Sequence, residues 1–362
     1  MTKKVTARTV AEAAGVSVGT VDRAFNERGR INEETKKRIL EAAKKLSYRP
    51  NRIASALGKR REIRFAVMLP REPAYFFDMM RKGFADAEKE SRDYGVSVEY
   101  ISTASLDPAA EEVALRSIDP SLYAGILINA GGPSINKQIN AFSLAGVPVA
   151  TFNSDIASSK RVFHVGHDDV SSGAIAAGLV GQFTMGRGDV AILTGFQRVR
   201  SHRQRVESFS KTLSEEYPGL KIIEVHEYED SEERAFAAMK SLLERKKGLA
   251  AVFASSAPGA VGAGKAIAAA NPDRIPSLVG YDISKHIREL MQNKFCSAVI
   301  YQDPYSQSNL ALRAMVRHVL EGWVPESKHI YIASKIVIRQ NIDEYLRASI
   351  RHEISASEIL EK

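Results

Sequence analysis

The sequence predicts an all-α helix-turn-helix headpiece, a short hinge helix, and an α/β body of two doubly wound parallel-sheet subdomains. Three observations lead to this prediction. The first 60 residues show helical periodicity, about ten short apolar runs begin at Phe65, and the series of runs starts again near Gly188. A chain of 362 residues is also too long for a single core, which agrees with two or three domains.

The composition is that of a soluble globular protein, with 44% hydrophobic and 26% charged residues. The net charge of +8 is concentrated at one end. Residues 1–62 hold 16 Lys and Arg against 7 Asp and Glu, whereas the other 300 residues hold 35 against 36. A basic module on a neutral body indicates a polyanionic partner.

Three features of the sequence indicate the cellular compartment of the protein. The single cysteine, Cys296, excludes an intramolecular disulfide and fits a reducing environment. The first ten residues, MTKKVTARTV, contain charges and no apolar segment, so we expect no secretory signal. No apolar run approaches the roughly 18 residues that cross a bilayer, so we expect a cytoplasmic protein without membrane contact.

The headpiece is predicted as three short helices around one small core. The turn AGVS separates the first two: Gly15 supplies a left-handed conformation, and Ser17 caps the second helix. A third helix begins near Asn32. Such an arrangement describes a helix-turn-helix module, with an ordinary three-helix bundle as the alternative. The expected core residues are Val10, Ala11, Ala14, Val21, Phe25, Ile39, Ala42, Ala43 and Leu46.

The segment YRPNRIASALGKRR comes next. Pro50 ends the preceding helix and can begin a new one, which Gly58 ends. A helix of about eight residues is marginal alone in water because nucleation dominates. We therefore expect it to form only against a partner, which makes it a candidate switch.

The body alternates apolar runs with helical patterns of about 12–18 residues. Strands that are buried on both faces and alternate with helices form parallel sheets, whose ligands bind beyond the strand ends. About ten strands are too many for one such sheet, so we divide them into two subdomains. The runs are FAVMLP, VSVEYIS, AGILINA, VPVATFN, FHVG, DVAILTG, KIIEVHEYE, LAAVFASS, SLVGYD and SAVIYQ.

These motifs resemble the lac-repressor (LacI/GalR) family of bacterial transcription regulators. The first 60 residues carry the resemblance in TVAEAAGVSVGTVDRAFN, NEETKKRILEAAKKLSYRPN and RPNRIASAL. From Phe65 onward, the chain resembles the sugar-binding fold of periplasmic ribose-binding proteins through FFDMMRKGFADAEKES, GILIN, GVPVATFN, LVGYD and SAVIYQ. The implied domains are a headpiece (1–49), a hinge helix and linker (50–62), an N-terminal subdomain (63–165 and 303–324), a C-terminal subdomain (166–302 and 325–345) and a tail (346–362).

The resemblance implies a ligand-responsive, nucleoid-associated bacterial repressor that binds a pseudo-palindromic operator as a homodimer. A sugar, sugar derivative or other polyol between the subdomains would set its DNA affinity, and no cofactor is implied. A transport-type solute-binding protein is the alternative; it predicts a signal peptide and no basic headpiece. A sugar sensor without operator binding, or an enzyme, is a third possibility.

In this family the second helix enters the major groove, and the hinge helices of a dimer open the minor groove with a leucine wedge. Val18, Gly19 and Arg23 then take the base-reading positions, and Leu57 is the wedge. Val18 and Gly19 offer no hydrogen-bonding side chain, so Arg23 is the main candidate for bonding guanine O6 and N7. A phosphate contact or a solvated helix face is the alternative for Arg23, and ordinary packing for Leu57. The other implied DNA-binding residues are Ser17, Thr20, Asn26, Thr35, Asn51 and Ala54.

The implied ligand site is the cleft between the subdomains. Phe76 and Phe77 follow the first strand, where aromatic rings stack on the apolar face of a sugar. Because adjacent residues on a loop cannot both face one core, we expect at least one of them to contact the ligand. The polar residues that the resemblance adds, with several donors and acceptors suited to a polyol, are Asn129, Asn153, His167, Asp168, Arg203, Arg205, Ser256, Asp282 and Gln302.

Two departures from the family bear on the ligand. Asn153-Ser154 stands where an aspartate-arginine pair is usual, and Ser256-Ala257 where an asparagine-aspartate pair is common. These losses disfavour a neutral pentose or hexose, whereas two arginines with His167 favour an acidic or phosphorylated sugar. The equal alternative is that Arg203 or Arg205 pairs internally with Glu207 or Asp168.

Other motifs argue against an enzyme. The stretch GAVGAGKA nearly matches a phosphate-binding loop, but Ala266 stands where the Mg²⁺-binding hydroxyl is needed. The eight histidines show no HxxxH spacing, and one cysteine cannot build a structural zinc site. No GxSxG elbow is present. We therefore expect neither catalysis nor a metal site.

Overall fold

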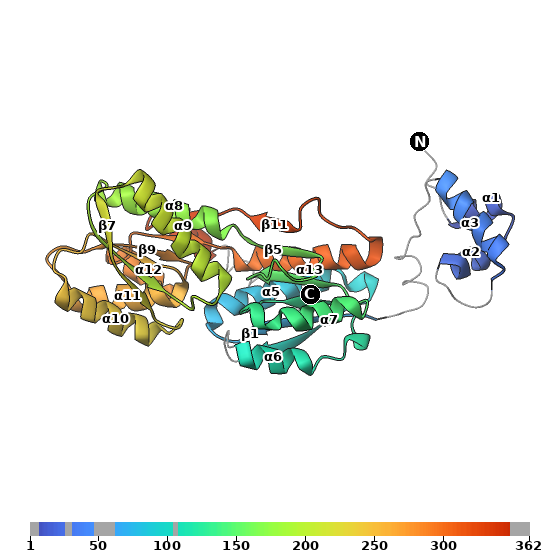
Figure 1. Cartoon of the computed structure of the whole chain (residues 1–362), viewed down its shortest axis with the longest axis horizontal. Helices are drawn as coiled ribbons and strands as arrows, with labels where there is room; N and C mark the ends of the chain where they lie inside the picture. Colours follow the sequence, from blue (N-terminus) through green and yellow to red (C-terminus); the bar gives the residue numbers. More distant parts are fainter. Residues whose placement is uncertain (1–6, 26–30, 47–61, 104–107, 348–362) are drawn as a thin grey trace, which may run out of the picture.

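The computed structural model describes residues 7–25, 31–46, 62–103 and 108–347 (Figure 1). Four residues with predicted DNA contacts lie outside these ranges: Asn26, Asn51, Ala54 and Leu57. The described residues include the three predicted headpiece helices and two six-stranded sheets.

The headpiece consists of α1 (Ala7–Ala14), α2 (Val18–Phe25) and α3 (Glu33–Lys45). Gly15 has a φ of +64°, which is the predicted left-handed turn, and the Ser17 hydroxyl accepts a 3.2 Å hydrogen bond from the Thr20 amide as the predicted cap. Val21 and Ile39 are fully buried in the core that the three helices share.

Each subdomain is built around one sheet. In spatial order, the first sheet contains β11 (His329–Ile332), β5 (Phe163–His167), β4 (Val149–Asn153), β3 (Gly125–Ile128), β1 (Ile63–Pro70) and β2 (Val96–Thr103). The second contains β12 (Lys335–Val337), β10 (Ala298–Tyr301), β9 (Ser277–Tyr281), β8 (Ala251–Ala254), β6 (Gly188–Thr194) and β7 (Leu220–Glu227). All neighbours are parallel except β12 on β10. The ten predicted runs are therefore all strands, and β11 and β12 were not predicted.

Helices cover both faces of each sheet (Figure 1). The first sheet packs against α5 (Ala74–Glu90) and α13 (Pro304–Glu321) on one face, and α6 (Pro108–Arg116) and α7 (Asn136–Leu144) on the other. The second packs against α8 (Asp169–Thr184) and α9 (Arg200–Glu216), and against α10 (Glu232–Arg245), α11 (Ala257–Ala270) and α12 (Lys285–Gln292). Single 3₁₀ turns occur at Arg92–Tyr94, Pro120–Leu122 and Pro133–Ile135.

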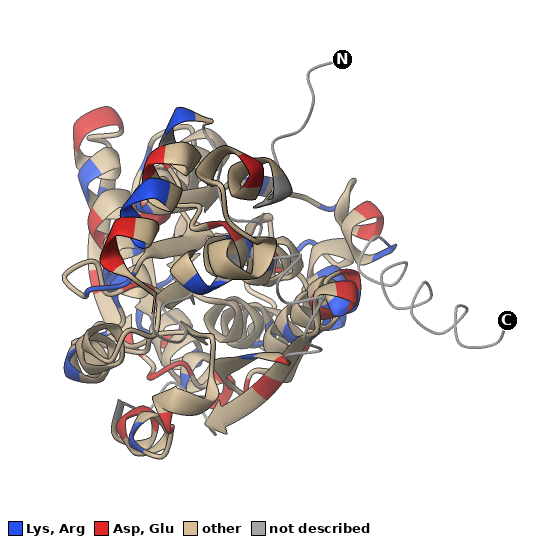
Figure 2. Ribbon diagram, turned by 90° about the vertical axis from the view of Figure 1, so that its right-hand side faces the viewer, with Lys and Arg blue, Asp and Glu red and all other residues tan. Residues whose placement is uncertain are grey.

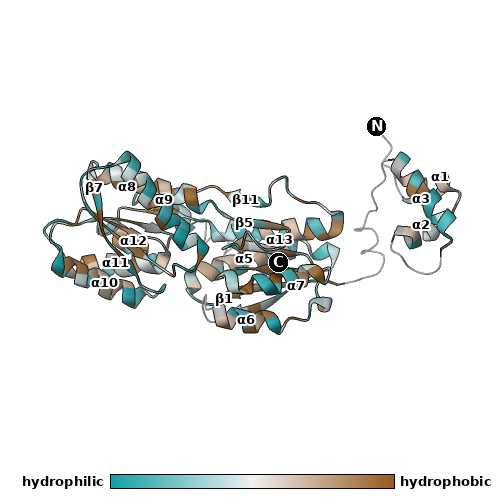
Figure 3. Cartoon of the chain, in the orientation of Figure 1, coloured by the Kyte–Doolittle hydropathy of each residue, from teal (hydrophilic) through white to brown (hydrophobic). Residues whose placement is uncertain are grey.

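The helices separate apolar from charged residues as a doubly wound fold requires. Hydrophobic residues concentrate in the strands and on the helix faces that meet them (Figure 3). Acidic and basic residues are interspersed along the outer helices (Figure 2), in keeping with the near-zero net charge of the body. None of the helices in the described residues is long and apolar enough to span a membrane.

The chain passes between the two sheets at three places. These are residue 168 between β5 and α8, residues 302–303 between β10 and α13, and residues 333–334 between β11 and β12. The expectation that 325–345 belongs wholly to the C-terminal subdomain is therefore wrong, because β11 pairs in parallel with β5 of the first sheet. Ile330 also packs against the core of the first subdomain.

The stretch GAVGAGKA lies inside α11, not in a phosphate-binding loop. A Cβ on Gly262 would lie 2.4 Å from the carbonyl oxygen of Glu232, and one on Gly264 would lie 2.5 Å from Leu290. Lys265 is paired with Glu232. The small residues therefore serve the close approach of α11 to α10 and α12.

Candidate functional site

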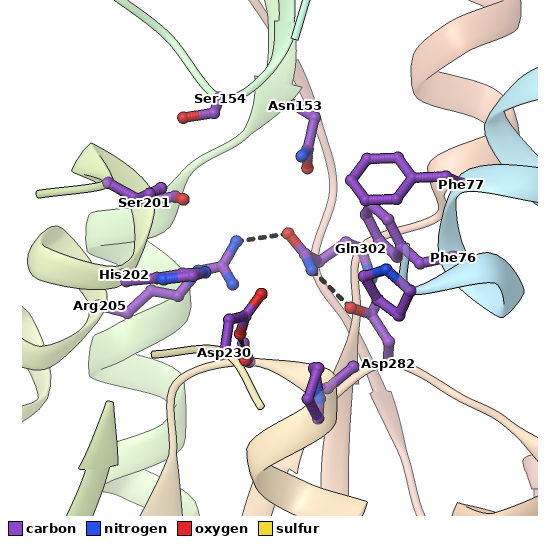
Figure 4. A pocket seen from close by; sticks show the side chains of 15 residues that line it. Phe76, Phe77, Asn153, Ser154, Ser201, His202, Arg205, Asp230, Asp282 and Gln302 are labelled. Atoms are coloured by element: carbon purple, nitrogen blue, oxygen red, sulfur yellow. Dashed lines mark hydrogen bonds between the residues drawn. The ribbon is translucent and has the colours of Figure 1, made fainter. Parts of the chain in front are cut away.

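A pocket lies between the two subdomains at the carboxyl ends of their strands, where parallel sheets bind ligands (Figure 4). The empty space among its lining residues is about 460 Å³, a volume that includes open solvent at the pocket mouth. The first subdomain contributes Pro73, Phe76, Phe77, Asn153 and Ser154; the remaining lining residues are Val199, Ser201, His202, Arg205, Asp230, Ser256, Ala257, Pro258, Asp282 and Gln302.

Arg205 organises the wall of the second subdomain. Its Nε donates a 2.8 Å hydrogen bond to Asp169, one terminal nitrogen donates to the carbonyl of Ser255 at 3.1 Å, and the other donates to Gln302. Its guanidinium carbon lies 4.1 Å from the ring centroid of Tyr281. Burial alone would lower the pKa of Arg205, but the charges of Asp169, Tyr281 and Asp282, with the hydrogen bond to Asp169, together outweigh it and raise that pKa. Arg205 therefore stays charged and held in one orientation.

Gln302 connects Arg205 to Asp282 (Figure 4). Its side-chain nitrogen donates to Asp282 Oδ2 at 2.6 Å, and its backbone amide donates to Oδ1 at 3.2 Å. Burial raises the pKa of Asp282 to about 6, although the Gln302 hydrogen bonds and the charge of Arg205 oppose this shift. The described contacts thus fix both oxygens of this carboxylate with neutral donors.

Several lining residues were not predicted from the sequence, among them the titratable residues Asp230 and His202. Asp230 follows β7 and accepts a hydrogen bond from Ser256, whose hydroxyl also lies 2.5 Å from that of Tyr228. His202 is 5% exposed on α9, and burial lowers its pKa, so the imidazole is neutral. His202 stands three residues before Arg205, so both project from one face of α9, a helical spacing that the sequence already contained.

Phe76 and Phe77 both line the pocket, and both also belong to the core of the first subdomain. Their rings are perpendicular, with centroids 5.2 Å apart. The argument that adjacent residues cannot share one core is wrong here, because they lie in the first turn of α5 and not on a loop. At this position the core of the subdomain ends and the pocket begins.

Asn153 ends β4 with a φ of +59° and turns its amide toward the pocket (Figure 4). Its side-chain nitrogen donates to Asn129 Oδ1 at 3.1 Å, and the backbone amide of Ser154 donates to the same oxygen at 3.3 Å. Asn129 is fully buried and does not line the pocket. It therefore orients the two residues that do.

Three further predicted residues also lie outside the pocket lining. His167 Nε2 lies 2.9 Å from the hydroxyl of Ser334. This contact connects two of the segments that pass between the sheets, the one at residue 168 and the one at residues 333–334. Asp168 caps α8 by accepting from the amides of residues 170 and 171. Arg203 is half-exposed and lies 3.8 Å from Glu207.

These positions remove the basis for an acidic or phosphorylated ligand. That expectation rested on Arg203, Arg205 and His167 acting together in the cleft. Arg203 pairs with Glu207, as the alternative proposed, and Arg205 pairs with Asp169 instead of Asp168. Burial, with the charge of Arg205, lowers the pKa of His167 to about 3, so this imidazole carries no positive charge either.

A buried cluster of charges stands beside the pocket. The Asp155 carboxylate pairs with Arg161 of its own subdomain and accepts a 2.7 Å hydrogen bond from the Thr151 hydroxyl. Arg200, at the start of α9 in the second subdomain, lies 3.5 Å from the same carboxylate. Burial would raise the pKa of Asp155, but its hydrogen bonds and the surrounding positive charge lower it well below its ordinary range.

The predicted base-reading residues lie on the outer surface of α2. Val18 is 46% exposed, and Gly19 beside it leaves the helix start open. Arg23 is exposed, with its Nε donating to the Gly19 carbonyl at 3.2 Å and a terminal nitrogen donating to the Thr20 hydroxyl at 3.4 Å. Thr35, a predicted phosphate contact, is partly exposed on α3.

Comparison with known proteins gives two family matches. Residues 6–51 match the family described as bacterial regulatory proteins, lacI family, and residues 65–322 match the periplasmic binding protein domain. A relative in Bacillus subtilis (strain 168), the probable HTH-type transcriptional repressor ExuR, is 30% identical over 295 residues, covering 77% of this chain and 81% of the relative. The ribose operon repressor of the same strain is 29% identical over 195 residues, covering 53% of this chain and 57% of that repressor.

The fold is also found in solved structures of sugar-binding proteins. GanP, a glucose-galactose binding protein from Geobacillus stearothermophilus, has a TM-score of 0.72 at 21% identity and covers 78% of this chain and 99% of its own. AraP, an arabinose binding protein from the same organism, has a TM-score of 0.67 at 23% identity over the same shares. At this level of identity the likeness establishes the architecture of the body.

Proposed function

The chain belongs to the lacI family of bacterial regulatory proteins, and we propose that its inter-subdomain pocket binds a small effector that controls operator binding. It is a DNA-binding transcription regulator with a periplasmic-binding-protein body, and not an enzyme. The observation that carries the proposal is the presence in one chain of an exposed recognition helix, α2, and a pocket walled by both body subdomains.

The DNA-binding part of the proposal follows the position of α2. Arg23 reads a guanine in the major groove, Val18 contacts a neighbouring base, and Gly19 lets the helix approach closely. Ser17, Thr20 and Thr35, together with Asn26, contact phosphates. The hinge residues Asn51, Ala54 and Leu57 enter the minor groove, with Leu57 as the wedge that kinks the duplex.

The effector part rests on the chemistry of the pocket. Phe76 is largely buried in the core and also lines the cavity. Asn153, Arg205 and Asp282 line the same cavity with hydrogen-bond donors and acceptors. A polyhydroxylated ring offers an apolar face and many hydroxyls, which suits this lining. The names of the ribose operon repressor and of the glucose-galactose and arabinose binding proteins support a sugar-like ligand.

The protein acts as a cytoplasmic homodimer and repressor in this proposal. Ligand binding changes how the two subdomains sit across the pocket, and this change favours or disfavours ordering of the hinge helix against DNA. A coupling free energy of about 1–3 kcal/mol is enough for such control. A dimer with two-fold symmetry predicts an operator made of two inverted half-sites.

Selection of bound sequences from a random DNA library by the purified full-length protein tests the proposal. The expected result is an inverted repeat, bound well above random DNA at 150 mM salt. A transport-type protein of the same fold would enrich no sequence. The proposal is overturned if the recovered pool stays random, or if the enriched site is a single asymmetric half-site.

A further inference from the structure

The pocket wall of the second subdomain is acidic. Among the described lining residues, Asp230 and Asp282 carry carboxylates, and Arg205 is the one permanent cation. The charge of Arg205 is matched by Asp169, which lies 2.8 Å away behind the lining. Asp230 and Asp282 are therefore left as an excess of negative charge facing the cavity.

Neutral groups hold both carboxylates. Ser256 donates to Asp230, and the side-chain and backbone nitrogens of Gln302 donate to Asp282. Within the part of the chain that the structure describes, neither carboxylate has an ion-pair partner within 4.0 Å. Burial lowers the pKa of His202, on the same wall, even though the charge of Asp230 opposes that shift. Asp282 is buried and Asp230 partly exposed; a buried carboxylate without a countercharge is costly, and a cation placed against it removes that cost.

The opposite wall contributes no charge. Pro73, Phe76 and Phe77 are apolar, and Asn153 and Ser154 are neutral. The face of an aromatic ring attracts an organic cation as well as the apolar face of a sugar. The Ser154 hydroxyl is buried without a hydrogen-bond partner in the described residues, so a polar group of the ligand would satisfy it.

A second unsatisfied hydroxyl comes from Tyr75, also in the first turn of α5. Its oxygen is buried and makes no hydrogen bond within the described chain. Burial raises the pKa of Tyr75 well above its ordinary value, and the charges of Asp282 and Asp230 raise it further, so the hydroxyl stays protonated.

We propose that the effector carries a positively charged amino group, as an amino sugar does, and that this group binds between Asp230 and Asp282. The proposal rests on the proposed function, because it specifies the ligand of the same pocket. A metal ion is a poor fit for this charge, since the described residues contain no cluster of three metal-ligating side chains. The hydroxyls of the ring then bind Asn153, Ser154 and Arg205.

Matched compounds test the proposal. The full-length protein is titrated by calorimetry with glucosamine, glucose and glucuronate, and with the corresponding galactose and mannose sets, which differ in one charged group. We expect at least one amine to bind roughly tenfold more tightly than its hydroxyl counterpart. Tighter binding of a neutral or acidic sugar overturns the amine assignment and leaves the proposed regulator intact. If none of the nine compounds binds, the assignment also fails, and the DNA selection decides the proposed function separately.

Asp230→Asn locates the amino group. Asn tolerates the left-handed φ of +57° at this position and keeps an acceptor for Ser256, so the fold is retained. The variant should lose roughly tenfold in affinity for the amine while its affinity for the hydroxyl counterpart changes little. Glu229→Gln is the matched control, because Glu229 pairs with Arg234 outside the pocket lining. Equal loss for amine and hydroxyl compounds, or an equal loss in the control, overturns the assignment.

Discussion

Asp155 and Arg200 belong to different subdomains, and their side chains lie 3.5 Å apart beside the pocket. Their chain neighbours, Ser154 and Ser201, both line the cavity, one from each wall. The same carboxylate pairs with Arg161 inside its own subdomain, where both side chains are 2% exposed. One aspartate therefore takes part in a structural pair and in a pair that links the two walls around the ligand.

Because Asp155 contacts both arginines in different surroundings, substitutions of Arg200 and of Arg161 should affect stability and effector binding differently. Arg200 is 34% exposed, so Arg200→Gln should cost less than about 1 kcal/mol of unfolding free energy. It should weaken effector binding severalfold, because the closed pocket loses a link between its walls. Arg161→Gln leaves the buried Asp155 carboxylate without its partner in that pair and should cost about 3–5 kcal/mol of unfolding free energy. Urea unfolding and calorimetric titration measure both; equal stability losses for the two variants would contradict the assignment.

Arg205→Lys tests the wall of the second subdomain. One ammonium group cannot reach Asp169, the Ser255 carbonyl and Gln302 in the fork geometry that a guanidinium provides. We expect a loss of about 2–3 kcal/mol in unfolding free energy and the loss of effector-induced thermal stabilisation. Arg203→Lys, on the exposed face of the same helix, is the control and should change neither quantity. Retained effector stabilisation in Arg205→Lys would remove Arg205 from the site.

The buried His167 should make stability depend on pH. Burial, with the charge of Arg205, lowers its pKa to about 3, whereas an unfolded histidine titrates near about 6.5. As the pH falls, the unfolded state therefore binds a proton at His167 before the folded state does. The stability that the neutral imidazole contributes is complete above pH 6.5 and is lost as the pH falls toward 3. Between pH 7.5 and pH 5 this one group should account for about 2 kcal/mol of lost stability.

His167→Gln checks this value by urea unfolding at both pH values. The stability difference between pH 7.5 and pH 5 should shrink by about 2 kcal/mol relative to the parent protein. His226→Gln, at an exposed position, is the matched control. An unchanged pH dependence in His167→Gln would show that this imidazole is not held neutral.

Arg23→Ala tests base reading by the headpiece. Arg23 is exposed on α2 beside Val18 and Gly19, which have no hydrogen-bonding side chain. Loss of a bidentate contact to guanine should cost about 1–3 kcal/mol on the preferred operator and less on variants that lack that guanine. Binding assays over a set of single-base operator variants measure this. A uniform loss, with a salt slope reduced by about one, would assign Arg23 to a phosphate.

All ten predicted runs formed strands; eight of them are central strands, which are apolar on both faces in a doubly wound sheet, and β2 and β7 lie at sheet edges. The edge strands β11 and β12 were missed because they are only 4 and 3 residues long and their side chains are mostly partly exposed. Their order also decides the subdomain boundary, since β11 joins the first sheet only through its pairing with β5. This pairing joins segments that are far apart in the sequence, so local sequence patterns do not predict it.

The site was predictable where a polar residue stands at or just beyond the end of a central strand, as for Asn153, Ser256, Asp282 and Gln302. A position at the end of a strand does not by itself distinguish a residue that contacts the ligand from a residue with another role. His167 ends β5 but lies where the chain passes between the sheets, and its ring lies within hydrogen-bond distance of the Ser334 hydroxyl. Asp230 was overlooked because the surrounding EYEDSEE sequence is typical of a solvated loop.

The central claim is that occupancy of the pocket sets operator affinity. The direct test is fluorescence anisotropy of the selected operator titrated with full-length protein, with and without an effector whose occupancy is measured by calorimetry. Our account predicts a change in operator affinity of about 5- to 150-fold, with the operator changing effector affinity by the same factor. An effector that saturates the pocket and leaves operator affinity unchanged would contradict it.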